Sequence, residues 1–433
     1  MMNSFFDKMG EKLMPFASKV SANRYLNAIK EGFFGVMPVI IVGSLFLLFT
    51  SIPINGYSEL MTGLLGENWS QIFMVPYRMS YGIMSIYVVV GIARSLAHFY
   101  KVDTRESIVV SFIAIFMLTP VLVTEDGLKG LPLDNFSASG LFLAIITTCL
   151  AVEIFRFVVQ KGWTIKLPDS VPPAIAKSFE LLLPVVVVIL LFQPLSILVQ
   201  NKLGMMIPEL IMNIFRPLIR ASDTLPAVII ILLIVHLLWF CGIHGVNVVV
   251  AIINPIILSN LSENQIALQA GQALPRIFAG GFLDAFVYLG GSGATIGLAI
   301  AMALSKNAHL KSIGRLSVVP GIFNINEPII FGAPIVMNPI LFIPFICVPI
   351  INASIAWFFL KTGIVGRIVT LVPWTTPSPI GALLATNFNL MAFLLSAFLV
   401  VLSIILYLPF LKVYVDVLNK QEAAEVANSA VEA

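Results

Sequence analysis

The stretch LLLPVVVVILLFQPLSILVQN, from Leu181 to Asn201, decides the fold, because it carries no charge over a length that can cross a bilayer. A membrane-spanning helix needs about 20 predominantly apolar residues. We expect this run, and each run that resembles it, to form one transmembrane helix. The other charge-free runs of this kind, one of them shorter, are Gly32–Ser58, Met79–Ala93, Ser107–Thr124, Asn135–Val152 and Ala285–Ser305.

The overall composition indicates a polytopic membrane protein. The 433 residues are 59% hydrophobic and only 11% charged, with a mean hydropathy of +0.99. A soluble globular chain carries about 25% charged residues. The composition therefore excludes a soluble enzyme, a disordered protein and a coiled coil, whereas a lipid-facing surface needs no charge. The formal net charge of +3 is too small to indicate nucleic-acid binding.

Three charge-free stretches are longer, and they predict irregular spans. Thr224–Ser262 and Ile368–Leu411 exceed one crossing, and the sequences CGIHGVNVV and PWTTPSPIG interrupt them; Pro328–Leu360 is the third. Each interrupted stretch can hold a span plus a short re-entrant segment. We expect an all-α polytopic membrane protein with about ten transmembrane helices. Charged and apolar residues at helical spacing also predict amphipathic interfacial helices at Met1–Lys30 and Leu203–Arg220.

The distribution of basic residues predicts the orientation in the membrane. Loops rich in Lys and Arg stay in the cytoplasm, whereas the loop Glu125–Asp134 contains only Lys129. We therefore expect both termini on the cytoplasmic side of the membrane. The basic clusters are Lys8, Lys12, Lys19, Arg24 and Lys30; Arg94, Lys101 and Arg105; Arg156, Lys161, Lys166 and Lys177; and Lys306, Lys311 and Arg315.

The cysteines and histidines do not predict a metal site. Cys149, Cys241 and Cys347 each lie in an apolar run, and none forms a CxxC pair. We interpret them as buried thiols, because free cysteine is often buried. His236 and His244 are eight residues apart with no carboxylate or cysteine pair between them, which is a weak metal pattern. We expect no metal and no cofactor.

Two polar motifs at membrane depth are candidates for chemistry. Glu327 lies in NINEPIIFG together with Asn324 and Asn326, and Pro328 makes a straight helix unfavourable there. Ionisable residues inside a membrane are costly and mark functional sites. His244 lies in GIHGVN, and its imidazole can donate, accept or carry a proton. A purely structural polar hairpin and a hydrogen-bonded core histidine are the alternatives.

Further candidates come from a glycine-rich segment and from tryptophans. The segment YLGGSGATIG, from Tyr288, does not match a nucleotide-binding pattern, so close helix packing or a break facing a substrate is the better interpretation. Trp374 opens the non-helical sequence WTTPSP, and Trp239 precedes His244 by five residues. Their aromatic faces suit a pyranose ring. The alternative is a tryptophan at the membrane interface.

Together these motifs resemble the membrane-embedded IIC subunit of bacterial phosphotransferase-system sugar transporters, in the lactose/cellobiose/diacetylchitobiose branch. GIHGVN at Gly242–Asn247, GGSGAT at Gly290–Thr295 and NINEPIIFG at Asn324–Gly332 carry the resemblance. The resemblance implies ten transmembrane helices with two re-entrant hairpins, and a homodimer. It also implies residues 1–220 as a scaffold and dimerisation half, and residues 221–433 as the sugar-binding half.

The resemblance also implies a vectorial reaction. A separate IIB protein would dock on the cytoplasmic side and phosphorylate the 6-hydroxyl of a β-linked disaccharide from its phosphocysteine. Glu327 would take the proton of that hydroxyl, and His244 would lie beside the sugar. The further sugar-binding residues that we expect are Trp239, Asn247, Tyr288, Ser292, Asn324, Asn326, Trp374 and, on a weaker local match, Ser139.

Two other classes of protein stay open at this point. A proton-coupled secondary sugar transporter can use Glu327 and His244 as a proton relay, since such transporters also have broken helices and polar sites near the midplane. An intramembrane hydrolase is the other class, but the chain lacks a GxSxG elbow or paired aspartates.

Overall fold

The computed structural model describes residues 15, 18–163, 165, 168, 171–172, 179, 181–333, 335 and 338–432, with side chains described up to residue 420. Most of the predicted interfacial helix Met1–Lys30 lies outside these residues. Four of the basic residues used for orientation, Lys8, Lys12, Lys166 and Lys177, also lie outside them.

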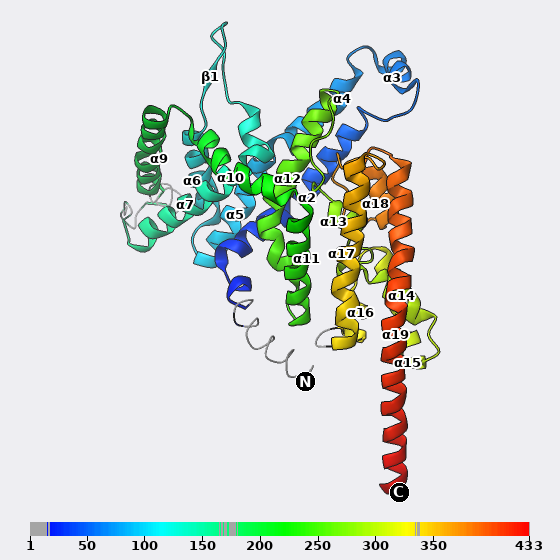
Figure 1. Ribbon diagram of the computed structural model, residues 1–433. Coiled ribbons are helices and arrows are strands. Elements are labelled where there is room, and N and C mark those ends of the chain that lie inside the picture. Colours follow the sequence, from blue (N-terminus) through cyan, green and yellow to red (C-terminus); the bar gives the residue numbers. More distant parts are fainter. Residues whose placement is uncertain are drawn as a thin grey trace.

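The described chain is mostly helical, as the composition predicts. The first half contains α2 (Arg24–Leu48), α3 (Tyr57–Leu65), α4 (Trp69–Met79), η1 (Tyr81–Ile83), α5 (Met84–Tyr100), α6 (Thr104–Leu118), η2 (Leu133–Phe136), η3 (Ala138–Gly140), α7 (Leu141–Gln160), α9 (Leu182–Leu203) and α10 (Ile207–Ser222). The second half contains α11 (Leu225–Phe240), α12 (Gly245–Gln269), α13 (Phe282–Phe286), η4 (Ser292–Ala294), α14 (Ile296–Ala303), α15 (Ala308–Ile322), α16 (Glu327–Gly332), α17 (Pro339–Thr362), α18 (Ser378–Ala385) and α19 (Leu390–Glu432). Figure 1 shows α11, α17 and α19 running roughly parallel, from top to bottom of the view.

The structure contains a short β-hairpin that the sequence did not predict. Strands β1 (Leu122–Val123) and β2 (Lys129–Gly130) pair antiparallel, with Leu122 opposite Gly130. Strand β1 lies at the end of the predicted span Ser107–Thr124, β2 lies in the predicted loop Glu125–Asp134, and the hairpin projects from the top of Figure 1. Apart from this two-stranded hairpin, the regular elements of the described residues are all helices.

The described residues confirm a polytopic helical protein, although the number ten stays a prediction. Seven helices are long and apolar enough to cross a membrane, and an eighth candidate is the pair α10 and α11, bent by 85°. The amphipathic helix predicted at Leu203–Arg220 corresponds to α10. Helices α13, α16 and α18 are too short to cross, because even eight residues cover only about 12 Å.

Three predicted spans differ clearly from the structure. In Ser107–Thr124 the helix α6 ends at Leu118, and the chain continues into β1. The other two are Gly32–Ser58 and Ala285–Ser305. The first begins earlier than Gly32, because the Asn23 side chain caps α2 by accepting the backbone N–H groups of Tyr25 and Leu26. It also ends at Leu48, five residues before Pro53. The run Ala285–Ser305 is not one helix: the chain leaves helical geometry between α13 and α14, where Gly290, Gly291 and Gly293 have positive φ.

The N-terminal group of helices has an apolar cluster of its own, whereas the main core cluster, from Ala28 to Tyr414, joins this group to the C-terminal helices. The first cluster is drawn from residues 83–211, mainly on helices α5, α6, α7 and α9, which lie together on the left of Figure 1. Helix α12 joins this part to the rest, since Tyr81 donates a hydrogen bond to the Leu258 carbonyl and Tyr77 donates one to Gln265. The boundary at residue 220 stays a prediction.

Helices α2 and α5 approach closely at a pair of glycines. A Cβ added at Gly91 would lie 2.6 Å from the Gly32 Cα, closer than real Cβ atoms approach other atoms. Small residues let membrane helices pack backbone to backbone. Gly35, on the same helix α2, has open space around its Cβ position.

We expect Gly91→Ala to destabilise the protein by about 1–3 kcal/mol, because the new methyl group must push α2 and α5 apart. The matched variant Gly35→Ala should be neutral or stabilising, since alanine favours a helix by about 0.5–1 kcal/mol over glycine. The thermal unfolding midpoint of the purified protein in detergent measures both effects. Equal midpoints for the two variants would contradict this account of the contact.

Candidate functional site at the helix breaks

The first break separates α11 from α12 and positions His244. The chain turns at Cys241–His244, where Gly242 has a φ of 77°. His244 caps α12, because its Nδ1 accepts the backbone N–H of Asn247 at 3.3 Å. The imidazole also lies against the indole of Trp239, with 4.3 Å between ring centroids. Three of the predicted site residues, Trp239, His244 and Asn247, are therefore brought together.

The second break, the GGSG segment, is held by side chains from two distant helices. The N–H of Gly293 donates to Nε2 of His236 at 2.9 Å, and the Gly293 carbonyl accepts the Tyr407 hydroxyl at 2.7 Å. His236 is fully buried, and its Nδ1 lies 2.6 Å from the Leu232 carbonyl. A Cβ at Gly293 would lie 2.2 Å from the ring of Phe345, so this position requires glycine.

The third break contains the NINEP motif, and Asn324 connects it to the other breaks. Its Oδ1 accepts the N–H of Gly290 at 2.9 Å and the hydroxyl of Ser378 at 3.0 Å. Its Nδ2 donates to the carbonyls of Trp374 at 2.6 Å and of Thr376 at 3.1 Å. One buried amide thus ties the glycine-rich segment to the WTTPSP segment.

Ser292 accepts hydrogen bonds from two other predicted site residues. Nε1 of Trp239 donates to the Ser292 hydroxyl at 3.1 Å, and Nδ2 of Asn326 donates to the Ser292 carbonyl at 2.8 Å. A Cβ on Gly291 would collide with Asn326, which explains the glycine there. The sequence motifs GIHG, GGSG and NINEP therefore form one connected polar cluster.

Glu327 and Trp374, two predicted residues next to this cluster, have exposed side chains. Glu327, the first residue of α16, is exposed, and no described cationic side chain forms an ion pair with it. Its carboxylate is close enough to His244 to act on the imidazole electrostatically. The Trp374 side chain is 52% exposed although its carbonyl is fixed by Asn324. Both side chains can therefore meet a ligand.

Tyr288 lies just before the glycine-rich segment, and its hydroxyl has no hydrogen-bond partner among the described residues. The side chain is only 6% exposed. An unpaired buried hydroxyl costs about 1–3 kcal/mol. This hydroxyl is consequently a candidate partner for a ligand.

Ser139 does not join the cluster in this structure. Its hydroxyl donates to the Asp134 carbonyl at 2.6 Å, within the N-terminal group of helices. Its element η3 packs against α12, which also carries Asn247. None of the hydrogen bonds of Ser139 among the described residues reaches another predicted site residue.

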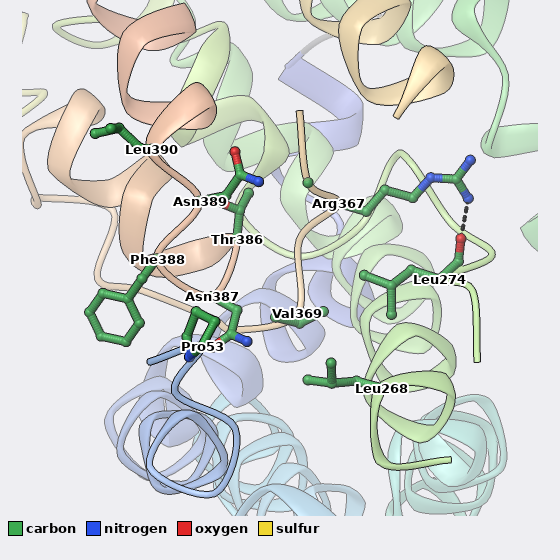
Figure 2. Close-up of a pocket in the computed structure, with 11 residues that line it drawn as sticks. Pro53, Leu268, Leu274, Arg367, Val369, Thr386, Asn387, Phe388, Asn389 and Leu390 are labelled. Atoms are coloured by element: carbon green, nitrogen blue, oxygen red, sulfur yellow. Dashed lines mark hydrogen bonds between the residues drawn. The ribbon is translucent and has the colours of Figure 1, made fainter. Parts of the chain in front are cut away.

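A cavity elsewhere contains none of the predicted site residues. It has a volume of about 400 Å³ and lies between the end of α12, the loop before α18 and the turn into α19 (Figure 2). Figure 2 shows Arg367 pointing away from the cavity, toward the Leu274 carbonyl to which it donates a hydrogen bond. Among the described residues, no group of three or more His, Cys, Asp or Glu side chains could hold a metal ion.

Comparison with known proteins identifies the family. The model of the phosphotransferase system EIIC family matches residues 30–349. The chain belongs to this family. It is therefore the multi-pass membrane component of a phosphotransferase system.

Relatives and a solved structure match almost the whole chain. The chain is 38% identical to the cellobiose-specific EIIC component of Geobacillus stearothermophilus, over 98% of this chain and 96% of that protein. It is 35% identical to the lactose-specific EIICB component of Staphylococcus aureus, over 97% of this chain and 74% of that protein. The crystal structure of ChbC, the IIC component of the N,N′-diacetylchitobiose-specific system, matches with a TM-score of 0.89 and 38% identity, covering 96% and 98% of the two chains.

Sequence reasoning did not identify how two residues organise this EIIC site. His236 entered the sequence analysis only as part of a weak metal pattern, and the structure shows that its Nε2 accepts the Gly293 N–H. Tyr407 received no role, because nothing in its own run of apolar residues marks it. Its partner Gly293 is 114 positions away.

We expect Asn324→Ala to lower the thermal unfolding midpoint strongly. Each buried group left without a partner costs about 1–3 kcal/mol, and this change removes the partner of the Gly290 N–H and of two carbonyls. The measurement is tryptophan-monitored unfolding in detergent. Asn68→Ala is the control, since Asn68 is exposed and its side chain makes no capping hydrogen bond; equal midpoints for both variants would refute the role of Asn324.

Proposed function

We propose that this EIIC protein binds a β-linked disaccharide of the cellobiose or diacetylchitobiose type and moves it into the cytoplasm. The names of the relatives support this sugar class, since they specify cellobiose, lactose and diacetylchitobiose. The single observation that carries the proposal is the connected cluster of Trp239, Ser292, Asn324 and Asn326 at three helix breaks. Irregular backbone at membrane depth is tolerated where it is buried in protein or lines a cavity.

The chemistry of the cluster suits a neutral polyol. Exposed Trp374 offers an aromatic face for a pyranose ring. The hydroxyl of Tyr288 and the amide of Asn247 offer donors and acceptors for sugar hydroxyls. We include Ser139 as a weaker contact that would require the sugar to reach η3.

A separate IIB protein would complete the reaction at the cytoplasmic face. Its phosphocysteine would transfer the phosphoryl group to the 6-hydroxyl of the sugar. The lactose-specific relative supports the pairing of the two parts, because its name joins the C and B components in one chain. The phosphoryl transfer would then drive transport, since it converts the incoming sugar into a sugar phosphate at the cytoplasmic face.

Glu327 would act as the general base for that hydroxyl. It is exposed, it has no described cationic partner, and a positioned carboxylate can take a proton from a hydroxyl within hydrogen-bond reach. His244 would hold the hydroxyl beside it. Because Nδ1 of His244 accepts a hydrogen bond from Asn247, the proton of the neutral ring lies on Nε2, which can donate to the sugar.

The two groups of helices would have different tasks. We propose residues 1–220 as the scaffold of a homodimer and residues 221–433 as the part that carries the sugar between the membrane faces. Both termini would be cytoplasmic. The start of α2 and the end of α19 lie toward the same end of Figure 1, and the β-hairpin lies at the opposite end.

The test is uptake of radiolabelled cellobiose, diacetylchitobiose and lactose by cells, with and without IIB. We expect phosphorylated disaccharide that requires IIB, and a loss on the order of 100-fold for Glu327→Gln, because the variant lacks the base. Glu59→Gln, at an exposed residue of α3, should behave as wild type. Accumulation of unmodified sugar that an uncoupler abolishes would instead make this a proton-coupled carrier, in which Glu327 and His244 relay protons.

A further inference from the structure

A second polar cavity borders His244 and lies between the start of α2 and the start of α12. Its volume is about 170 Å³. The start of α2 contributes Asn27 and Lys30, and the start of α12 contributes His244 and Asn247. The cavity therefore joins residues that are more than 200 positions apart and shares only the His244–Asn247 edge with the sugar cluster.

Lys30 brings a positive charge to this cavity. Its side chain is half-buried, and no described residue forms an ion pair or hydrogen bond with it. The neighbouring basic residue on α2, Arg24, lies 3.8 Å from Glu153 and is thus paired. Lys30 is also close enough to His244 to act on it electrostatically. A half-buried cation that has no partner among the described residues favours an anionic ligand.

The opposite wall adds further groups that favour an anion. The cavity borders the N-terminus of α12, a helix of 25 residues, whose first N–H groups carry partial positive charge. His244 stands at this N-terminus, where its Nδ1 accepts the backbone N–H of Asn247. The amides of Asn27 and Asn247 can also donate. Lysine, helix N-terminus and amide donors together match the chemistry of a phosphate group.

We propose that this cavity binds the phosphoryl group of a phosphomonoester, and that Lys30 stabilises that group during its transfer and in the sugar 6-phosphate product. The inference rests on the proposed function and assigns it a phosphate site. In the transfer, the S–P bond of the IIB phosphocysteine breaks and an O–P bond to the sugar 6-oxygen forms. The sulfur leaves as a thiolate, and Glu327 takes the hydroxyl proton.

The charges around the cavity change in a direction that favours this step. Glu327 is the carboxylate that acts on His244 from the sugar side, and as an anion it would repel an incoming phosphoryl group. Once it has taken the hydroxyl proton it is neutral, so the repulsion disappears as the O–P bond forms. Lys30 keeps its charge throughout. Phosphoryl transfer depends mainly on positioning and on charge stabilisation of this kind.

The experiment compares Lys30→Gln, Lys30→Arg and wild type in nanodiscs of phosphatidylcholine. Isothermal titration with cellobiose and with cellobiose 6′-phosphate should show equal affinity for the neutral sugar in all three. Binding of the sugar phosphate should weaken about 10-fold in Lys30→Gln, the effect of losing one charge-assisted contact, and recover in Lys30→Arg. In the IIB-coupled assay, kcat of Lys30→Gln should fall on the order of 10- to 100-fold with KM for sugar unchanged.

Controls separate this inference from its alternatives. Lys161→Gln, at an exposed lysine beyond the end of α7, should match wild type in every measurement. If wild type forms no phosphorylated sugar with IIB, the proposed function fails. If wild type phosphorylates sugar and Lys30→Gln does so equally well, or loses neutral-sugar affinity to the same degree, only the phosphate site fails.

A lipid headgroup is the other source of a phosphate group at this position. Nanodiscs that contain labelled phosphatidylglycerol test it directly. Equal binding of cellobiose 6′-phosphate to wild type and Lys30→Gln, together with weaker phosphatidylglycerol binding by Lys30→Gln, would show a lipid site and overturn the proposal. Selective loss of sugar-phosphate binding with unchanged lipid binding is the result expected.

Discussion

The structure depends on one constraint: wherever a helix breaks inside the bilayer, protein groups must satisfy the backbone that the break exposes, because lipid cannot. Two side chains meet much of this requirement. Asn324 binds the Gly290 N–H and the carbonyls of Trp374 and Thr376, and His236 binds the Gly293 N–H. Without these partners, the short helices α13, α16 and α18 would leave unpaired polar groups at membrane depth.

The same constraint explains why the site lies where it does. Side chains that complete the breaks must come from other breaks or from the helices around them, so the breaks gather in one place. Three polar groups form no hydrogen bond with the described residues and are available to ligands. They are the Glu327 carboxylate, the Tyr288 hydroxyl and the Lys30 ammonium, which lines a cavity with His244. Glu327 and Tyr288 belong to the proposed sugar site, and Lys30 belongs to the proposed phosphate site. Both sites border His244.

The sequence predicted the spans and the breaks better than it predicted their partners. Charge-free runs indicate where helices lie, and clusters of Gly and Pro indicate where they stop. The contacts of Asn324 and Tyr407 join positions 34 to 114 residues apart, and no local pattern encodes them. Ser139 was placed by a weak local match, and the structure leaves it outside the cluster. Lys30 was interpreted only as part of a basic segment, because its nearness to His244 exists only in the fold.

The most direct test of this account is an experimental structure of the protein with bound cellobiose. We predict the sugar at the three breaks, with one pyranose ring against Trp374 and the 6-hydroxyl within hydrogen-bond distance of Glu327 and of Nε2 of His244. Well-ordered sugar in the cavity of Figure 2, beside Arg367 and Asn387, with the cluster around Asn324 unoccupied, would contradict it.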